Sequence, residues 1–550
     1  MRIIAVDTET TVKNGERASP YQDDLLLITI NEGGTIKAST NLSDFEDLLG
    51  NPTILKVFQN AAFDIQFLEY SSFLTIENVW DTMLVERLLT AGTFVDCSLG
   101  GIVLRYCDVV LDKGVRDSFW RHRGELSDFQ IEYAKNDVRY LIEVYKKQKE
   151  AIDARGMTHI AQLENDLAPI IARMELSGVG FDPEAWEDII EEEKKIIPEL
   201  DRDLQMTLSK TFKMGLFGEI LGAVNLNSPS QLSAAMRRIG VKVEDTSEGE
   251  LRSCLHPVAG KILEYRSHVG RLKWDYPKFV NSKTKRIHPD YNQLGAATGR
   301  FSCSDPNLQQ VPKDPKFRRM FRALPGYKLI TLDYSQQELR VMAELSQDPG
   351  LIEACKSTDV HLENARMIYD DTTIQKNDPR RSTAKNANFA MAYRAGVKVF
   401  AATAGITVKE SSRFLKVLHK AYPGVFTWGD RMHRFLLDNG YVSTIGGRRR
   451  YFQGVNSKGL NYLSIASNSP VQGSSADMLK LAMVYIHDAL KQYDAKLVLC
   501  VHDEVIVEAE EKNVEEIAEV VKAAMVRAGE YYVKVVPVPV DGLIGDTWSK

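Results

Sequence analysis

The stretch VLCVHDEVIVEA (Val498–Ala509) places three titratable residues, His502, Asp503 and Glu504, between two apolar runs. Both runs are rich in β-branched residues and are typical of buried strands. Charged groups between buried strands are normally paired or bind a metal, because an unpaired buried charge is costly. The alternative is a hairpin whose polar turn points into water, and this stretch by itself leaves both interpretations open.

The length and composition of the chain bound its class. A chain of 550 residues and 61.9 kDa is too long for one core and predicts at least two domains. No apolar run approaches the roughly 18 residues of a membrane span, and the N-terminus does not read as a signal peptide. The six cysteines are scattered without a CxxC pair, which argues against a zinc site or a disulfide framework. We therefore expect a cytoplasmic protein that does not bind membranes.

The charge distribution points to a polyanionic partner although the net charge is −6. Residues 271–328 contain thirteen Lys and Arg against four Asp. Aromatic residues are interleaved with them, among them Trp274, Tyr276, Phe279, Tyr291, Phe301, Phe317 and Phe321. Such a stretch fits a phosphate-backbone footprint, and the alternative is an ordinary solvated face.

The order of predicted elements divides the chain into two catalytic regions. Residues 1–150 alternate strand-like and helical runs, which indicates an α/β unit around a central sheet. A helix then runs out into a linker near Gly156. Residues 160–275 are mostly helical, a strand follows at 327–333, and a long helical region leads to the hairpin at 498–509.

The first region carries a set of acids. VDTET places Asp7 and Glu9 two residues apart on a strand, so that both point to the same face. Asp64 closes the run VFQNAAFD, and Asp137 lies on an amphipathic helix, four residues after Tyr133 and on its face. Acids that converge without basic partners repel one another unless divalent cations bind them.

The second region combines acids with a cationic helix. The run YKLITLDYSQQELR leaves Asp333 at the end of a strand, with Glu338 five residues later. In NDPRRSTAKNANFAMAYRAG (377–396), Asp378 can cap a helix that starts at Pro379. Four of its residues recur every four positions and share one face: Arg381, Lys385, Phe389 and Tyr393. Two cations followed by two rings suit a triphosphate joined to a base, and the alternative is a surface helix with core aromatics.

The order DxE, NxxxD, YxxxD of the first region resembles the three motifs of the DEDDy 3′–5′ exonucleases. The resemblance implies two Mg²⁺ ions held by Asp7, Glu9, Asp64 and Asp137, with Tyr133 helping to orient the attacking water.

The second region resembles the family A DNA polymerases. The matching segments are DYSQQELR (333–340), RSTAKNANFAMAY (381–393), VHDEV (501–505), ATGRFSCSDPNLQQVP (297–312), STIGGRRR (443–450) and NSPVQGSSADMLK (468–480). The resemblance implies a multidomain α/β and α+β chain, with an RNase H-like exonuclease domain before a right-hand polymerase domain. The implied boundaries are 1–150 for the exonuclease and 151–550 for the polymerase, with a thumb at about 160–285 and palm and fingers at about 286–550.

By this resemblance, Asp333 and Asp503 hold two Mg²⁺ ions, with Mn²⁺ as the alternative, and Glu504 sits near the metals or the primer end. Lys385 is the expected proton donor to pyrophosphate. The implied nucleotide site comprises Arg318, Glu338, Arg381, Lys385, Phe389 and Tyr393, where Glu338 fills the space that a ribose 2′-OH needs. The implied primer–template contacts are Arg300, Asn307, Gln309, Asn468, Gln472 and His502, largely through backbone and minor groove.

Three positions depart from the family pattern. The family usually has Gly at the positions of Ala390 and Arg394, and many members carry an arginine at the position of Ser464. These departures bear on fingers closure and primer grip rather than on the metal chemistry.

The resemblance predicts DNA-directed DNA synthesis from dNTPs with 3′–5′ proofreading, by a monomer whose helicase and single-strand-binding partners are unknown. We expect that no 5′-nuclease domain precedes residue 1, and this compactness predicts a phage-type replicase acting in the host cytoplasm. The rivals are a single-subunit RNA polymerase, disfavoured by Glu338 and the exonuclease motifs, and an exonuclease whose second half only clamps DNA. Intact Asp333, Lys385 and Asp503 argue against the clamp.

Overall fold

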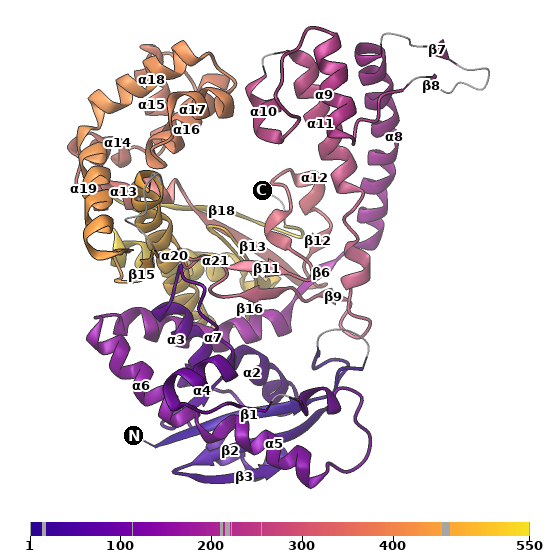
Figure 1. Cartoon of the computed structure of the whole chain (residues 1–550), viewed down its shortest axis with the longest axis vertical. Coiled ribbons are helices and arrows are strands. Elements are labelled where there is room, and N and C mark those ends of the chain that lie inside the picture. The colour runs from indigo at the N-terminus through magenta and orange to yellow at the C-terminus, as the bar shows by residue number, and fades with distance from the viewer. Residues whose placement is uncertain are drawn as a thin grey trace.

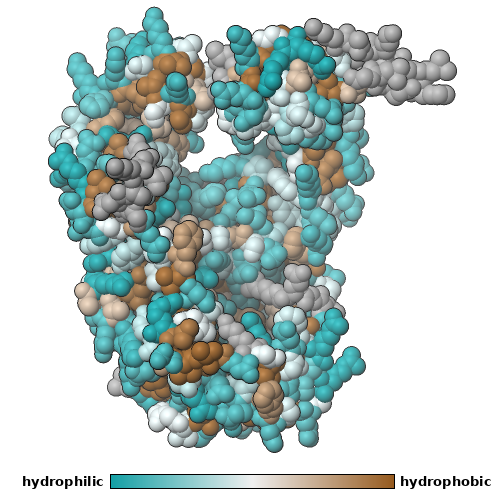
Figure 2. All heavy atoms as spheres, viewed as in Figure 1, coloured by the Kyte–Doolittle hydropathy of each residue, from teal (hydrophilic) through white to brown (hydrophobic). Residues whose placement is uncertain are grey.

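The computed structural model describes residues 2–13, 18–112, 114–209, 213–214, 220–221, 223–254, 256–453 and 462–548. Figure 1 shows an N-terminal domain at the bottom, a sheet-containing centre, and two helical lobes above the centre. Figure 2 shows a hollow between the two lobes, with a mainly hydrophilic floor. None of the helices in the described ranges combines the length and the apolarity that crossing a bilayer requires.

The N-terminal domain is built on a five-stranded sheet in the order β3-β2-β1-β4-β5. Its central strand β1 (Ile3–Thr10) pairs antiparallel with β2 (Leu25–Glu32) and parallel with β4 (Leu55–Phe58). The remaining strands are β3 (Thr35–Ser39) and β5 (Val79–Asp81). The helices are α1 (Glu46–Leu49), α2 (Ala61–Tyr70), α3 (Thr82–Leu89), α4 (Leu99–Cys107), α5 (Asp128–Arg139) and α6 (Leu141–Ala154). The alternation confirms the α/β character predicted for this part of the chain.

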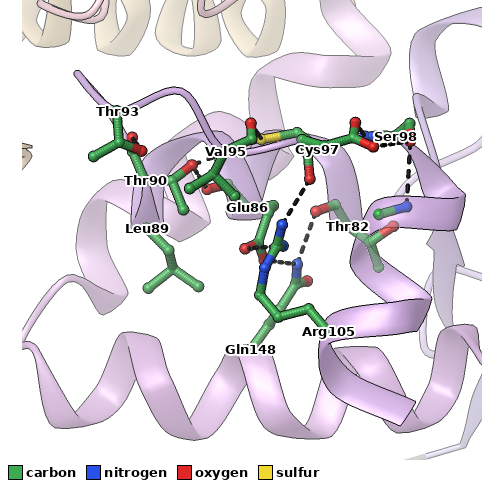
Figure 3. Close-up of polar contacts among 12 residues, drawn as sticks. Thr82, Glu86, Leu89, Thr90, Thr93, Val95, Cys97, Ser98, Arg105 and Gln148 are labelled. Carbon is green, nitrogen blue, oxygen red and sulfur yellow. Dashed lines mark hydrogen bonds and ion pairs between the residues drawn. The ribbon is translucent and has the colours of Figure 1, made fainter. Parts of the chain in front are cut away.

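The buried carboxylate of Glu86 ties α3, α4 and α6 together (Figure 3). Arg105 of α4 donates to Glu86 Oε1 at 2.7 Å, and Gln148 of α6 donates to Glu86 Oε2 at 3.0 Å. The connection between α3 and α4 also reaches the C-terminal part of the molecule, because the Tyr451 N–H donates to the Ala91 carbonyl at 2.8 Å. These contacts fix the helices beside the first carboxylate set and join the two halves.

Helix α7 (Thr158–Ser177) is shared between the two halves, so the linker expected near Gly156 is only a short turn. Gly156 adopts a left-handed φ of +66°, which ends α6 and lets α7 start at once. Helix α7 packs against α2 on one side and against α20 (Leu463–Leu490) and β16 (Ala495–Val501) on the other. Its apolar residues enter the cores of both halves, which explains why a single helix can replace a linker.

The centre of the molecule is an antiparallel four-stranded sheet in the order β16-β17-β13-β18, which we call the palm. The strands besides β16 are β13 (Tyr327–Tyr334), β17 (Glu504–Glu510) and β18 (Val540–Gly545). Strands β16 and β17 form the predicted hairpin, and only His502 and Asp503 lie between them. His502 has a φ of +58°, which allows so tight a turn. The register pairs Asp333 with Glu504, so the turn brings Asp503 next to the end of β13.

Helices form the two upper lobes and cover the palm. The lobe with its own apolar core, which we call the thumb, contains α8 (Pro183–Leu208), α9 (Pro229–Arg238), α10 (Glu248–Ser253) and α11 (Pro257–Arg271). The opposite lobe, which we call the fingers, contains α14 (Pro349–Lys356), α15 (Val360–Tyr369), α16 (Pro379–Ala392), α17 (Val397–Ala404) and α18 (Val408–Ala421). Helices α13 (Gln337–Ser346), α19 (Pro423–Asn439) and α21 (Val514–Tyr532) join α20 around the palm. The thumb and the fingers meet where α10 contacts α17, above the hollow.

The remaining strands and α-helix of the described part of the chain are short. They are α12 (Pro315–Arg318), β6 (Val179–Phe181), β7 (Lys213–Met214), β8 (Ile220–Leu221), β9 (Arg286–Ile287), β10 (Asp290–Asn292), β11 (Ser302–Ser304), β12 (Phe321–Arg322), β14 (Tyr441–Ser443) and β15 (Arg449–Tyr451).

Two candidate active sites

The first site is a cavity of about 630 Å³ in the N-terminal domain, and the five residues predicted there line it. Strand β1 presents Asp7 and Glu9 on the same face, and α5 presents Asp137. One ligand oxygen from each of these three acids lies within 4.8 Å of the others. Tyr133 lies one turn before Asp137 on α5 and lines the same cavity. Carboxylate oxygens at this spacing suit a divalent cation such as Mg²⁺.

Asp64 lines the same cavity but is held differently from the other three acids. It lies in the first turn of α2, and its Oδ1 accepts hydrogen bonds from the backbone N–H of Thr8 at 3.0 Å and from the Thr8 hydroxyl at 2.7 Å. These bonds fix the carboxylate against β1 and leave Oδ2 as the oxygen available to a ligand. Asp64 therefore belongs to the cavity without joining the tight group of three.

Burial and mutual repulsion disfavour negative charge in the first site. Burial, and then the charges of Asp64, Asp137 and Glu9, raise the pKa of Asp7 well above its usual range. Burial and the neighbouring acids likewise raise the pKa of Glu9 to about 8. Burial raises the pKa of Asp64 to about 7, although the bonds from Thr8 oppose the shift. Positive charge in the cavity would favour the ionised forms of Asp7, Glu9 and Asp64, and a bound metal ion can supply it.

Arg116 is a residue of the first site that the sequence did not single out. It lines the cavity, and its positive charge lowers the pKa values of Asp7 and Glu9 against the larger effects that raise them. It lies among several basic residues between 116 and 123, and nothing in the sequence distinguishes it from Arg121 or Arg123.

The second site is a cavity of about 490 Å³ between the palm and the fingers. Asp333 from β13 and Asp503 from the β16–β17 turn both line it, so the turn that opened the sequence analysis points into a cavity and not simply into water. Eight further residues predicted for this site also line it: Arg300, Gln309, Glu338, Arg381, Lys385, Phe389, Tyr393 and His502.

Helix α16 presents the predicted cationic and aromatic face to the second site. Asp378 caps the helix by accepting a hydrogen bond from the Arg380 N–H at 2.9 Å, and Pro379 is its first residue, as predicted. The Lys385 ammonium lies 6.0 Å from the centre of the Phe389 ring. The Phe389 and Tyr393 rings are stacked, with their centres 6.2 Å apart.

Glu338 and Tyr393 are in contact, as the resemblance implies. The Tyr393 hydroxyl donates to Glu338 Oε2 at 3.3 Å, and Gln472 Nε2 donates to the Tyr393 hydroxyl at 3.2 Å. Arg300 forms an ion pair with Glu338 Oε1. Two predicted DNA contacts, Arg300 and Gln472, are therefore linked through side chains to the predicted sugar site.

Two predicted site residues, Glu504 and Arg318, are not among the residues that line the second cavity, and their places by the metals and the nucleotide stay predictions. The buried Glu504 carboxylate accepts from Arg318 Nη1 at 3.0 Å and from Trp548 Nε1 at 2.6 Å. Arg318 is equally buried and lies over the Trp548 ring. Glu504 lies directly opposite Asp333 in the sheet, and its carboxylate is occupied by these two donors.

Three predicted DNA contacts, Asn307, Asn468 and Gln472, also lie outside the lining of the second cavity, although Gln472 contacts Tyr393. Asn307 caps a short helical turn by accepting from the Gln309 N–H at 3.1 Å. Asn468 lies on α20, and its buried Oδ1 has no hydrogen-bond partner in the described part of the chain. Their contacts with DNA stay predictions.

Lys313 and His361 line the second cavity although the sequence did not single them out. Lys313 lies in the basic stretch, and its positive charge is the only feature of the sequence that could have pointed to it as a site residue. The Nδ1 atom of His361 lies 2.7 Å from Asn388 Nδ2, and this buried contact holds the imidazole in place. Burial and the charges of Arg381 and Lys385 lower the pKa of His361 to about 4, so its imidazole is neutral at pH 7.

The departures from the family pattern have local structural consequences. Arg394 adopts a φ of +52°, the left-handed region that favours glycine, and its guanidinium pairs with Asp430 at 2.5 Å. The Ser464 hydroxyl donates to the Tyr393 carbonyl. Both departures therefore act at the end of α16, next to Tyr393.

About half of the cations in the basic stretch at 271–328 are paired with acids in the folded chain, so the stretch is not a continuous row of free cations. Seven of its thirteen cations form ion pairs with acids: Arg271, Arg286, Arg300, Lys316, Arg318, Arg322 and Lys328. Most of these acids come from distant parts of the sequence, which a local charge count cannot register. Lys313 remains available to an anion in the cavity.

The fold and the two carboxylate centres define a class: an exonuclease domain followed by a polymerase domain with palm, fingers and thumb. Residues 194–550 match the family model described as DNA polymerase family A, and residues 1–153 match the model described as 3′-5′ exonuclease. The chain belongs to DNA polymerase family A.

The relatives of this chain include bacterial DNA polymerases I. Identity is 30% with that of Chloroflexus aurantiacus, over 91% of this chain and 55% of the relative. Identity with the Synechocystis enzyme is 31%, over 92% of this chain and 54% of the relative. Identity with the Pseudomonas aeruginosa enzyme is 29%, over 100% of this chain and 63% of the relative. The chain therefore spans between about half and two thirds of the length of these curated relatives. Their names do not test the predicted phage origin.

A solved structure supports the fold. It is described as the POL domain of Pol1 from M. smegmatis in complex with DNA primer-template and dNTP. The TM-score is 0.84 at 24% identity, and the likeness covers 99% of this chain and 95% of that one.

Proposed function

We propose that this chain synthesises DNA on a template from dNTPs and removes mispaired 3′ ends with its exonuclease domain. The observation that carries the proposal is the second cavity, where two acids face the cationic side of α16. Asp333 and Asp503 supply oxygen ligands for Mg²⁺, and Arg381, Lys385 and Lys313 supply positive charge for a triphosphate. The first cavity, with acids and little countercharge, suits the separate hydrolytic reaction.

In the polymerase reaction, Mg²⁺ at Asp333 and Asp503 would activate the primer 3′-hydroxyl and stabilise the leaving pyrophosphate. Lys385 lies one turn along α16 from Arg381, so both can reach one polyphosphate, and its ammonium can donate a proton to the departing oxygen. Phe389 and Tyr393 offer flat apolar faces to the base and the sugar. Glu338 occupies the space beneath the sugar and excludes a 2′-hydroxyl.

In the exonuclease reaction, Asp7, Glu9, Asp64 and Asp137 would hold the metal ions, which activate a water molecule for attack on the terminal phosphodiester. Burial, followed by the charges of Asp137 and Glu9, raises the pKa of Tyr133 above its usual value. Its phenol therefore remains protonated and can orient the attacking water by hydrogen bonding.

We propose that the hollow between thumb and fingers holds primer–template DNA, as the printed description of the M. smegmatis structure gives for that protein. Arg300, Gln309 and His502 line the cavity at its base and are placed to meet the primer end. We further propose a division of the chain near residue 150, a monomeric enzyme and a replicative role.

One assay tests the proposal. A labelled primer–template with Mg²⁺ is incubated with dNTPs, with rNTPs, or with no nucleotide. We expect extension with dNTPs, little with rNTPs, and shortening of the primer without nucleotide. Extension by rNTPs instead would indicate an RNA polymerase, and shortening without any extension would indicate an exonuclease whose second half only clamps DNA.

A further inference from the structure

Arg381, the arginine proposed to bind the triphosphate, is already occupied by a carboxylate of the fingers. Its Nε donates to Asp359 Oδ2 at 2.7 Å and its Nη2 donates to Asp359 Oδ1 at 3.0 Å. The side chains are only 24% and 13% exposed, so solvent screens this pair weakly. Two parallel N–H···O bonds are the strongest geometry that an arginine and a carboxylate can form.

Asp359 is held in place independently of Arg381. It precedes α15 and caps that helix, because its Oδ1 also accepts from the Leu362 N–H at 3.1 Å. Since α15 and α16 pack against each other, the carboxylate is fixed at the edge of the cavity that Arg381 lines. The pair is therefore a built feature of the fingers rather than a chance contact of two mobile side chains.

Lys385 provides the contrast. It lies one turn after Arg381 and lines the same cavity, yet within the described ranges no carboxylate pairs with its ammonium. One cation of the nucleotide site is thus neutralised in advance while the next is free. A general requirement for negative charge near the cations of this site would apply to Arg381 and Lys385 alike, so it does not explain why only Arg381 is paired.

We propose that Asp359 is a specificity-determining residue, an internal counter-ion that Arg381 exchanges for the polyphosphate of the incoming nucleotide. The inference rests on the proposed polymerase function. A guanidinium binds carboxylate and phosphate with the same N–H fork, so the same two N–H groups cannot serve both. Only a highly charged polyphosphate that also reaches Lys385 displaces Asp359 effectively. After pyrophosphate forms, the return of Arg381 to Asp359 promotes its release.

The test is the Asp359→Asn variant, because asparagine caps a helix as well as aspartate does and removes only the charge. The dissociation constant of the complementary dNTP is measured on a dideoxy-terminated primer–template with Mg²⁺, together with the inhibition constant of pyrophosphate. We expect both constants to fall by about five- to tenfold, the effect of removing one competing ion pair that is partly buried. Asp359→Ser, which also retains a capping side chain, should shift both constants in the same direction.

A matched control lies on the same helix. Arg380 pairs with Asp371 at 2.8 Å, and neither residue lines the cavity. Asp371→Asn removes the same charge from the neighbouring arginine and should leave both constants unchanged. Unchanged or weaker dNTP binding by Asp359→Asn would overturn the inference, since Asp359 would then only cap α15 or orient Arg381. Absence of dNTP binding by the unaltered protein would instead refute the proposed polymerase function.

Discussion

The two candidate sites differ in where their positive charge comes from. In the N-terminal cavity, Asp7, Glu9 and Asp137 crowd together, and the charge of Arg116 offsets them only in part. In the palm, two acids face Arg381, Lys385 and other basic side chains across one cavity. The first arrangement depends on metal ions to balance its charge. The second carries cations of its own and is therefore suited to a polyanionic substrate such as a nucleoside triphosphate.

The largest expected effect is separation of the two activities. Asp7→Ala should reduce primer degradation by about a thousandfold or more, because loss of a metal ligand removes several kcal/mol of transition-state stabilisation. Extension should be nearly unchanged in this variant. Asp503→Ala should do the reverse, and both rates are measured on the same primer–template. If either substitution removed both activities in a folded protein, the assignment of two independent sites would be wrong.

A smaller effect is expected at the sugar site. Shortening Glu338 to Ala should cost about 1–3 kcal/mol of discrimination against ribonucleotides, the scale of one unsatisfied buried polar group. Glu338→Gln is the matched control, because it retains the bulk while losing the charge that pairs with Arg300. The measurement is kcat/KM for dCTP and rCTP with each variant. An unchanged ratio for Glu338→Ala would show that another residue excludes the 2′-hydroxyl.

The distinction between free and paired cations in the basic stretch can be tested by measuring how DNA affinity depends on salt concentration. Lys313 lines the palm cavity, whereas Arg322 pairs with Asp182 at 2.9 Å. Lys313→Ala should therefore reduce the log–log slope of DNA affinity against salt by about 0.9, the value for one phosphate contact on duplex DNA. Arg322→Ala should change the slope little. Equal slopes for the two variants would contradict the distinction between free and paired cations.

The smallest expected effect is the pH dependence of stability in the metal-free protein. The pKa of Glu9 rises from 4.5 to about 8 in the folded state. An acid whose pKa is higher in the folded state destabilises the fold progressively as the pH rises from the lower value to the higher one. We therefore expect Tm in EDTA to fall by about 1 °C between pH 5 and 8, which corresponds to about 1 kcal/mol for a chain of this length.

Glu9→Gln should flatten this decline, because glutamine cannot ionise. Mg²⁺ should raise Tm more at pH 8 than at pH 5, since it binds the deprotonated acids. A Tm that is independent of pH in the metal-free protein, with no difference between the wild type and Glu9→Gln, would contradict the charge crowding in the first site.

The sequence was informative where chemistry follows local periodicity. Alternation along β1 determines that Asp7 and Glu9 share a face, and the helical repeat determines that Arg381, Lys385 and Phe389 line one side of α16. The β16–β17 hairpin was equally predictable, because two β-branched runs separated by a polar turn have few other solutions. What these patterns could not give is the partner of each charged side chain.

Partners were decided by tertiary structure alone. Arg318 pairs with Glu504, which lies 186 positions away, and the two side chains are buried against each other. Arg381 pairs with Asp359, which lies 22 positions earlier and is brought close by the packing of α15 against α16. An ion pair depends on the distance and burial of two side chains, and both quantities are set by how the elements pack. The sequence by itself therefore determined which groups each element presents, and only the fold decided which of them remain free to bind metal, nucleotide or DNA.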